Sequence, residues 1–91
     1  MLHADGSAEP PAKLADTAPM PDGFTVDDAG NLYVATLAGI QIFGPGGALR
    51  RTIAVPEQPA NCAFGGADRR TLYITACTSL YQVISAIPGK P

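Results

Sequence analysis

The chain of 91 residues carries few side chains with recognised catalytic or metal-binding chemistry. His3 is the single histidine, so neither a Ser/His/Asp nor a Cys/His nucleophilic arrangement can be assembled around it. Cys62 and Cys77 lack CxxC spacing and have no histidine near them, which argues against a zinc site. We expect both to be small buried apolar residues, with a disulfide between them as the alternative.

Two polar residues remain as candidates for a functional site. Asp22 stands in the tripeptide Pro21-Asp22-Gly23, which by composition alone is typical of a turn. Asn61 follows at the expected start of a strand, where its side chain either caps the strand entry or binds a substrate hydroxyl, and the residues by themselves favour capping. Gly65-Gly66 has no GxGxxG pattern and no helix after it, so it predicts a tight bend rather than a phosphate site.

These candidates lie in a sequence that repeats itself once. Four pairs of identical residues are each separated by 40 positions: Phe24/Phe64, Asp28/Asp68, Leu32/Leu72 and Tyr33/Tyr73. A period near forty that carries several short strands is typical of one β-propeller blade. We therefore predict an all-β fold of about two blades, each a four-stranded antiparallel meander. Equal positions of the two tyrosines indicate packing between blades, and Asp27, Asp28 and Asp68 are expected to be turn carboxylates.

The expected elements follow from alternation and turn signals. An apolar stretch covers residues 22–27, and the expected strands are 31–36, 39–43, 49–55, 61–65, 71–76 and 80–84. Four segments result: a loop with the end of a preceding blade (1–21), a first complete blade (22–56), a second, incomplete blade (57–85) and a tail (86–91). Residues 11–14 could hold one outer strand, whereas Pro88, Gly89 and Pro91 end any order in the tail. No helix is expected.

Composition excludes several classes of partner. Hydrophobic residues make up 46% and charged residues 15%, which is typical of a globular chain, and the net charge is −2. Without a basic cluster, the chain gives no support to nucleic-acid binding, and no apolar run is long enough to cross a bilayer. The N-terminus lacks the pattern of a signal peptide, so we expect a cytoplasmic protein, or a periplasmic one if a signal precedes this segment.

Three motifs stand in series: Pro21-Asp22-Gly23-Phe24 followed by residues 26–35, residues 39–43 with a glycine-rich turn, and residues 61–66 followed by Leu72-Tyr73-Ile74-Thr75. In order and spacing the chain resembles the C-terminal part of the SMP-30/gluconolactonase/LRE-like (regucalcin) family over about residues 5–84. The resemblance implies a six-bladed propeller that hydrolyses sugar lactones with one divalent metal in its channel. Members are several times longer than this chain, which would supply part of one blade, a whole blade and most of another.

The resemblance also implies a role for Asp22, which matches an aspartate that is a metal ligand and a candidate general base. Asn61 stands 39 positions after Asp22, at the expected start of the next inner strand, so it could face the channel and bind a substrate hydroxyl. A carboxylate suits Ca²⁺ best, with Zn²⁺, Mn²⁺ or Mg²⁺ as alternatives. The other family ligands, an early glutamate and a Pro-Asn-Gly asparagine, have no counterpart, since Glu9 and Glu57 stand in other contexts. The isolated chain is therefore expected to bind metal weakly and to be inactive.

Two further interpretations stay open. One is a non-catalytic propeller segment that serves as a binding or scaffold module. In the other, three copies of the chain assemble into one closed propeller, because blades hide their faces only against neighbours. Exposed blade faces also predict poor expression or self-association of the isolated chain.

Overall fold

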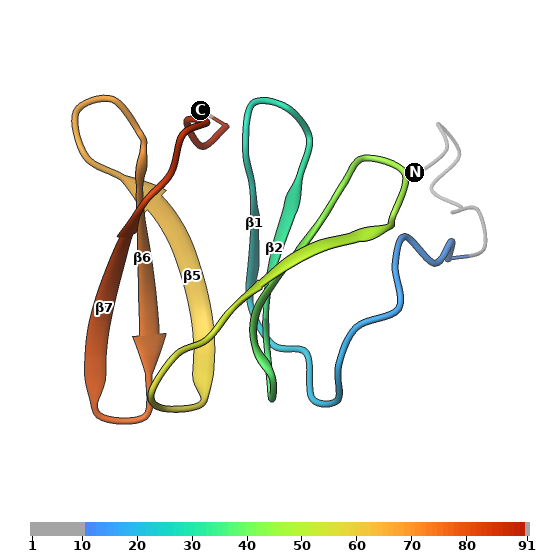
Figure 1. Cartoon of the computed structure of the whole chain (residues 1–91), viewed down its shortest axis with the longest axis horizontal. Coiled ribbons are helices and arrows are strands. Elements are labelled where there is room, and N and C mark those ends of the chain that lie inside the picture. Colours follow the sequence, from blue (N-terminus) through green and yellow to red (C-terminus); the bar gives the residue numbers. More distant parts are fainter. Residues whose placement is uncertain (1–10, 91) are drawn as a thin grey trace, which may run out of the picture.

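The computed structural model describes residues 11–90, and their strands form two antiparallel sheets that stand side by side (Figure 1). The first sheet has the order β1 (Phe24–Val26), β2 (Leu32–Thr36), β3 (Gly39–Phe43) and β4 (Leu49–Ile53). The second has the order β5 (Pro59–Gly65), β6 (Thr71–Ala76) and β7 (Ser79–Ile84). Among residues 11–90, no helix is long and apolar enough to span a membrane.

The all-β prediction and the expected strands are confirmed, with shifts of one or two residues at several ends. Each sheet is a meander, as the repeat predicts, and the second lacks a fourth strand within the described residues. Gly30 takes the positive φ of 84° that the turn between β1 and β2 requires. Residues 11–14 form no strand. His3 and Glu9 lie outside the described residues.

The core lies between the two sheets. Strict alternation along each strand sends one set of apolar side chains inward, and its buried members are Tyr33, Ala35, Ile40, Cys62, Leu72 and Ile74. Tyr33 of the first sheet meets Phe64 of the second edge to face, with ring centroids 5.0 Å apart. This geometry favours aromatic pairs beyond the area that they bury. Each sheet thus needs its neighbour to cover an apolar face.

β1 and β5, the first strands of the two sheets, which we call the inner strands, lie against each other and join the sheets at one end. The Gly23 amide donates to the Ala60 carbonyl at 2.9 Å. A Cβ at Gly23 would overlap the Asn61 carboxamide, so the close approach of the two strands requires glycine there.

The prediction that order ends in the tail is wrong. Residues 85–90 form an ordered strap across the end of both sheets that carries the β1–β2 and β5–β6 turns (Figure 1). On the second sheet, the Gly89 amide donates to the Arg69 carbonyl at 2.6 Å. On the first, the Pro88 carbonyl accepts from the Asp28 amide at 2.8 Å, and the Lys90 amide donates to Val26 at 2.9 Å. Prolines end regular pairing, but they leave carbonyls free to accept such bonds.

Asp27 also differs from its prediction as a plain turn carboxylate, because its side chain is fully buried. It accepts hydrogen bonds from the Ala29 and Asn31 amides at 2.9 and 3.0 Å, from Asn31 Nδ2 at 2.9 Å and from the Tyr33 hydroxyl at 2.8 Å. A buried carboxylate is tolerated when it is satisfied in this way. Asp27 therefore fixes both the turn and the orientation of Tyr33.

Only one cysteine is buried as expected. Cys62 points into the core, where its thiol donates to the Tyr33 carbonyl at 3.3 Å and burial raises its pKa to about 11. Cys77 is exposed in the turn between β6 and β7, and both thiols are free, so the disulfide alternative is wrong.

Glu57 holds the connection between the sheets against the β6–β7 turn. Its carboxylate accepts from the Thr78 and Tyr81 hydroxyls at 2.9 and 2.8 Å. Hydrogen bonds, first from Ser79 and then from Tyr81 and Thr78, lower its pKa from 4.5 to about 2. A lowered folded-state pKa means that the ionised group stabilises the fold above pH 4.5 and that this contribution is lost as the pH falls towards 2.

We predict that Glu57→Gln makes stability less dependent on pH in that window. Urea midpoints followed by circular dichroism should fall more steeply for the wild type than for Glu57→Gln between pH 4.5 and about 2. Parallel pH profiles for the two proteins would show that the carboxylate has no such role.

Gly23→Ala should destabilise the chain by about 1–3 kcal/mol, because the new methyl group must displace Asn61. Asn61→Ala removes the overlapping atoms beyond Cβ, so most of the cost should disappear in the double variant. A double-mutant cycle from urea unfolding measures this coupling. Strictly additive free energies would contradict the contact between the two inner strands.

Candidate functional site

Asp22 lies just before β1 and is exposed at the mouth of a shallow groove of about 360 Å³. Its amide donates to the Ala35 carbonyl at 2.9 Å, which ties the backbone of the tripeptide to β2. The groove opens on the face of the first sheet that points away from the second. Its apolar lining comes from Leu14, Phe24, Leu32, Val34 and Phe43. Lys13 also lines it, paired with Asp16 at 3.0 Å.

Asn61 is the third residue of β5, which begins at Pro59, and it uses its carboxamide locally. Its Oδ1 accepts a hydrogen bond from the Cys62 amide at 2.8 Å, a contact that lies inside the strand and not at its entry. The side chain is exposed beside a hollow of about 100 Å³ on the outward face of the second sheet. Tyr73 and Thr75 form the opposite wall of this hollow.

The two candidates share an end of the inner strands, but they open onto different faces. Gly23, next to Asp22 in the chain, contacts the Asn61 side chain. Asp22 borders the groove of the first sheet, however, whereas Asn61 borders the hollow of the second. The backbones near Asp22 and Asn61 therefore lie close together, but within residues 11–90 the two side chains do not line a common pocket.

The described residues do not by themselves fit a metal ion. Within residues 11–90, no group of three or more histidine, cysteine, aspartate or glutamate side chains could hold one. Hard divalent cations need several oxygen ligands, and Asp22 offers a single carboxylate in its groove.

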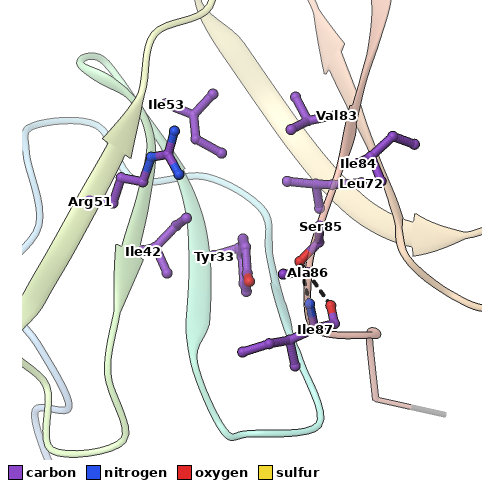
Figure 2. A pocket seen from close by; sticks show the side chains of 10 residues that line it. All are labelled: Tyr33, Ile42, Arg51, Ile53, Leu72, Val83, Ile84, Ser85, Ala86 and Ile87. Carbon is purple, nitrogen blue, oxygen red and sulfur yellow. Dashed lines mark hydrogen bonds between the residues drawn. The ribbon is translucent and has the colours of Figure 1, made fainter.

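Sequence reasoning missed a cleft of about 300 Å³ between the outer strands of the two sheets (Figure 2). Its walls are mostly aliphatic: Ile42, Ile53, Leu72, Val83 and Ile84. The Ser85 hydroxyl is engaged with the Ile87 backbone, at 2.8 Å to its carbonyl and 3.2 Å to its amide. The Tyr33 hydroxyl is bound to Asp27, and burial together with this carboxylate raises its pKa. The cleft offers no free nucleophile or base for hydrolysis.

Two known proteins that are similar to this chain are named as lactonases. A gluconolactonase of Zymomonas mobilis is 40% identical over 68 residues, which cover 72% of this chain and 19% of that protein. A candidate sugar lactone lactonase of Bacillus subtilis is 36% identical over 74 residues, which cover 77% of this chain and 25% of that protein. This chain thus spans a quarter or less of these two relatives.

Solved structures of similar proteins have the same arrangement of strands as this chain. A candidate gluconolactonase matches with a TM-score of 0.87 and 27% identity, covering 98% of this chain and 31% of that structure. The gluconolactonase of Xanthomonas campestris matches with a TM-score of 0.72 and 30% identity, covering 87% of this chain and 25% of that structure. The model of the SMP-30/gluconolactonase/LRE-like region matches residues 3–78, more than half of the sequence. This chain belongs to the SMP-30/gluconolactonase/LRE-like family.

Proposed function

We propose that this chain is part of a six-bladed β-propeller hydrolase that opens sugar lactones. Family membership and the named lactonases among its relatives support the reaction class. The observation that carries the proposal for this segment is Asp22, an exposed carboxylate whose backbone is anchored at the entry of β1. In the proposed propeller β1 would be an innermost strand that lines the central channel, so Asp22 would stand where a substrate could reach it.

In the proposed reaction, a water oxygen attacks the lactone carbonyl carbon and the bond from that carbon to the ring oxygen breaks. The water gives up a proton, the ring oxygen gains one, and the product is the open hydroxy acid. Asp22 would accept the proton of the attacking water as general base. Asn61 would orient the sugar by a hydrogen bond to one of its hydroxyls, provided that its carboxamide turns away from the Cys62 amide and the hollow of the second sheet towards the Asp22 side of Gly23, which it already contacts.

Asp22 would also be one ligand of a divalent metal, with Ca²⁺ as the first candidate and Zn²⁺, Mn²⁺ or Mg²⁺ as alternatives. When bound, such an ion would polarise the carbonyl and acidify the attacking water. The remaining ligands would have to come from outside residues 11–90, because that part of the chain holds no suitable cluster.

A non-catalytic propeller module is the second candidate function. The observation that favours it is the lack of a metal-holding cluster within residues 11–90, together with the groove at Asp22, which is largely apolar. Such a module would keep the sheets and their packing and would use its faces for binding.

Grafting separates the two functions. We predict that the Zymomonas mobilis gluconolactonase keeps its activity when its matching segment is replaced by this chain's segment, and that Asp22→Asn in the graft lowers kcat by about 100-fold or more. Asp28→Asn is the matched control, because Asp28 is an exposed carboxylate paired with Arg69 at 3.5 Å. Lactone opening is followed by acid release at constant pH.

Full activity of the Asp22→Asn graft would rule out the catalytic role of this residue. A graft that folds but is inactive even with Asp22 present would instead favour the non-catalytic module.

A further inference from the structure

Met20, two residues before Asp22, has a backbone conformation that its sequence disfavours. Its φ is 59°, and Met20 and Arg69 are the two residues other than glycine with a positive φ within residues 11–90. In this left-handed region the Cβ of a side chain comes too close to the backbone. Pro21 follows, and a proline favours an extended conformation with negative φ in the residue before it. Met20 is therefore strained for two independent reasons.

The side chain of Met20 does not offset this strain by burial, because 65% of its surface is exposed. Arg69 differs, since its amide donates to the Gly66 carbonyl at 3.2 Å in the β5–β6 turn and its guanidinium pairs with Asp28 at 3.5 Å. A glycine or an asparagine would adopt the backbone conformation of Met20 more easily. Backbone strain that local packing does not explain is typical of functional sites.

Backbone hydrogen bonds on both sides hold Met20 in this conformation. Before it, the Pro19 carbonyl accepts a hydrogen bond from the Leu37 amide of the β2–β3 turn at 3.0 Å. After it, the Asp22 amide donates to the Ala35 carbonyl of β2 at 2.9 Å. The chain turns between these two anchored points as it enters β1 (Figure 1). The direction in which the chain reaches Asp22 therefore depends on the backbone of Met20.

The β2–β3 turn, which anchors Pro19, is itself fixed by a buried hydroxyl. Thr36 is fully buried, and its Oγ1 donates to the Gly39 carbonyl at 2.9 Å and accepts from the Ala38 amide at 3.2 Å. A firmly held turn can maintain strain in the loop bound to it, whereas a loose turn would move and release the strain. The support for Met20 is therefore built into the first sheet.

We propose that Met20 is a positioning residue for Asp22: its left-handed backbone sets the direction in which the Asp22 carboxylate points. This inference rests on the proposed function, because a general base must be placed accurately beside the attacking water. The role belongs to the backbone conformation of Met20 and not to its thioether. Variants at this position should therefore rank by how readily they adopt a positive φ, and not by how apolar they are.

Amide hydrogen exchange of the whole chain, followed by NMR, tests the positioning directly. The Asp22 amide of Met20→Val should exchange about tenfold faster than that of the wild type, because a β-branched residue resists a positive φ. Met20→Gly and Met20→Asn should keep this amide at least as slow as in the wild type, because both residues tolerate the conformation. Equal exchange of the Asp22 amide in Met20→Val and the wild type would overturn the proposal.

Two controls separate a local change from general unfolding. Leu37→Val is the matched variant, because Leu37 is also exposed and apolar but has no positive φ, and the substitution keeps its backbone amide. It should leave the exchange of the Asp22 amide unchanged. The Gly44 amide, which donates to the Ala48 carbonyl at 2.9 Å in the β3–β4 turn, should exchange at the wild-type rate in every variant.

Kinetics of the graft in the Zymomonas mobilis gluconolactonase test the consequence for the reaction. Met20→Val should lower kcat by about tenfold or more and leave KM nearly unchanged, because the substrate still binds beside a misplaced base. Met20→Asn should stay within about twofold of the unmodified graft. The opposite ranking, with Met20→Val active and both Met20→Asn and Met20→Gly impaired, would overturn the proposal, since the thioether itself would then be needed.

The two measurements distinguish this proposal from the proposed function. Full activity of the Asp22→Asn graft would refute the catalytic role of Asp22, whereas faster exchange in Met20→Val would still support the positioning of Asp22 by Met20. Unchanged exchange in Met20→Val, together with an inactive Asp22→Asn graft, would refute the positioning and leave the catalytic role of Asp22 in place.

Discussion

The rest of this structure depends on the hydrogen bonds that the buried Asp27 carboxylate accepts. It is fully buried, and it stays ionised because donors surround it: burial raises its pKa, but hydrogen bonds from Asn31, Tyr33 and Ala29 outweigh this and lower it overall. One of these bonds sets the Tyr33 ring against Phe64 of the second sheet. The Asp27 backbone also bridges to Gly89 of the strap. A turn, the core between the sheets and the strap therefore meet at one residue.

The orientation of Tyr33 determines which faces are packed and which are open. The inner face of the first sheet closes on the second through Tyr33, and the repeat then leaves Phe24 and Tyr73 on opposite outer faces. At the other end, the inner strands meet closely because Gly23 has no side chain, and this contact sets the entry of β1 where Asp22 is exposed. The same packing that stabilises the pair of sheets thus positions the candidate site residue and leaves Phe24 and Tyr73 exposed on the two outer faces.

Much of the fold could be predicted from the sequence, because alternation such as Gly39–Phe43 and the repeat both report directly on strands. The burial of Asp27 could not be predicted, because the repeat aligns Asp28 with Asp68, whereas the position equivalent to Asp27 holds Ala67. The strap could not be predicted either, because prolines indicate the end of regular strand pairing and give no information on single hydrogen bonds to distant turns. For the site, the motif suggested Asp22 as a candidate, but chain order could not show that Asp22 and Asn61 border hollows on different faces.

The free energy of unfolding of Asp27→Ala is the measurement that tests this account most directly, with Asp28→Ala as the neighbouring exposed control. The account predicts a loss of about 3 kcal/mol or more for Asp27→Ala, because the variant leaves buried donors of Asn31 and Tyr33 unpaired. For Asp28→Ala it predicts a loss of about 0.5 kcal/mol or less, since only an exposed ion pair is removed. Equal losses in the two variants would contradict the central role of the buried carboxylate.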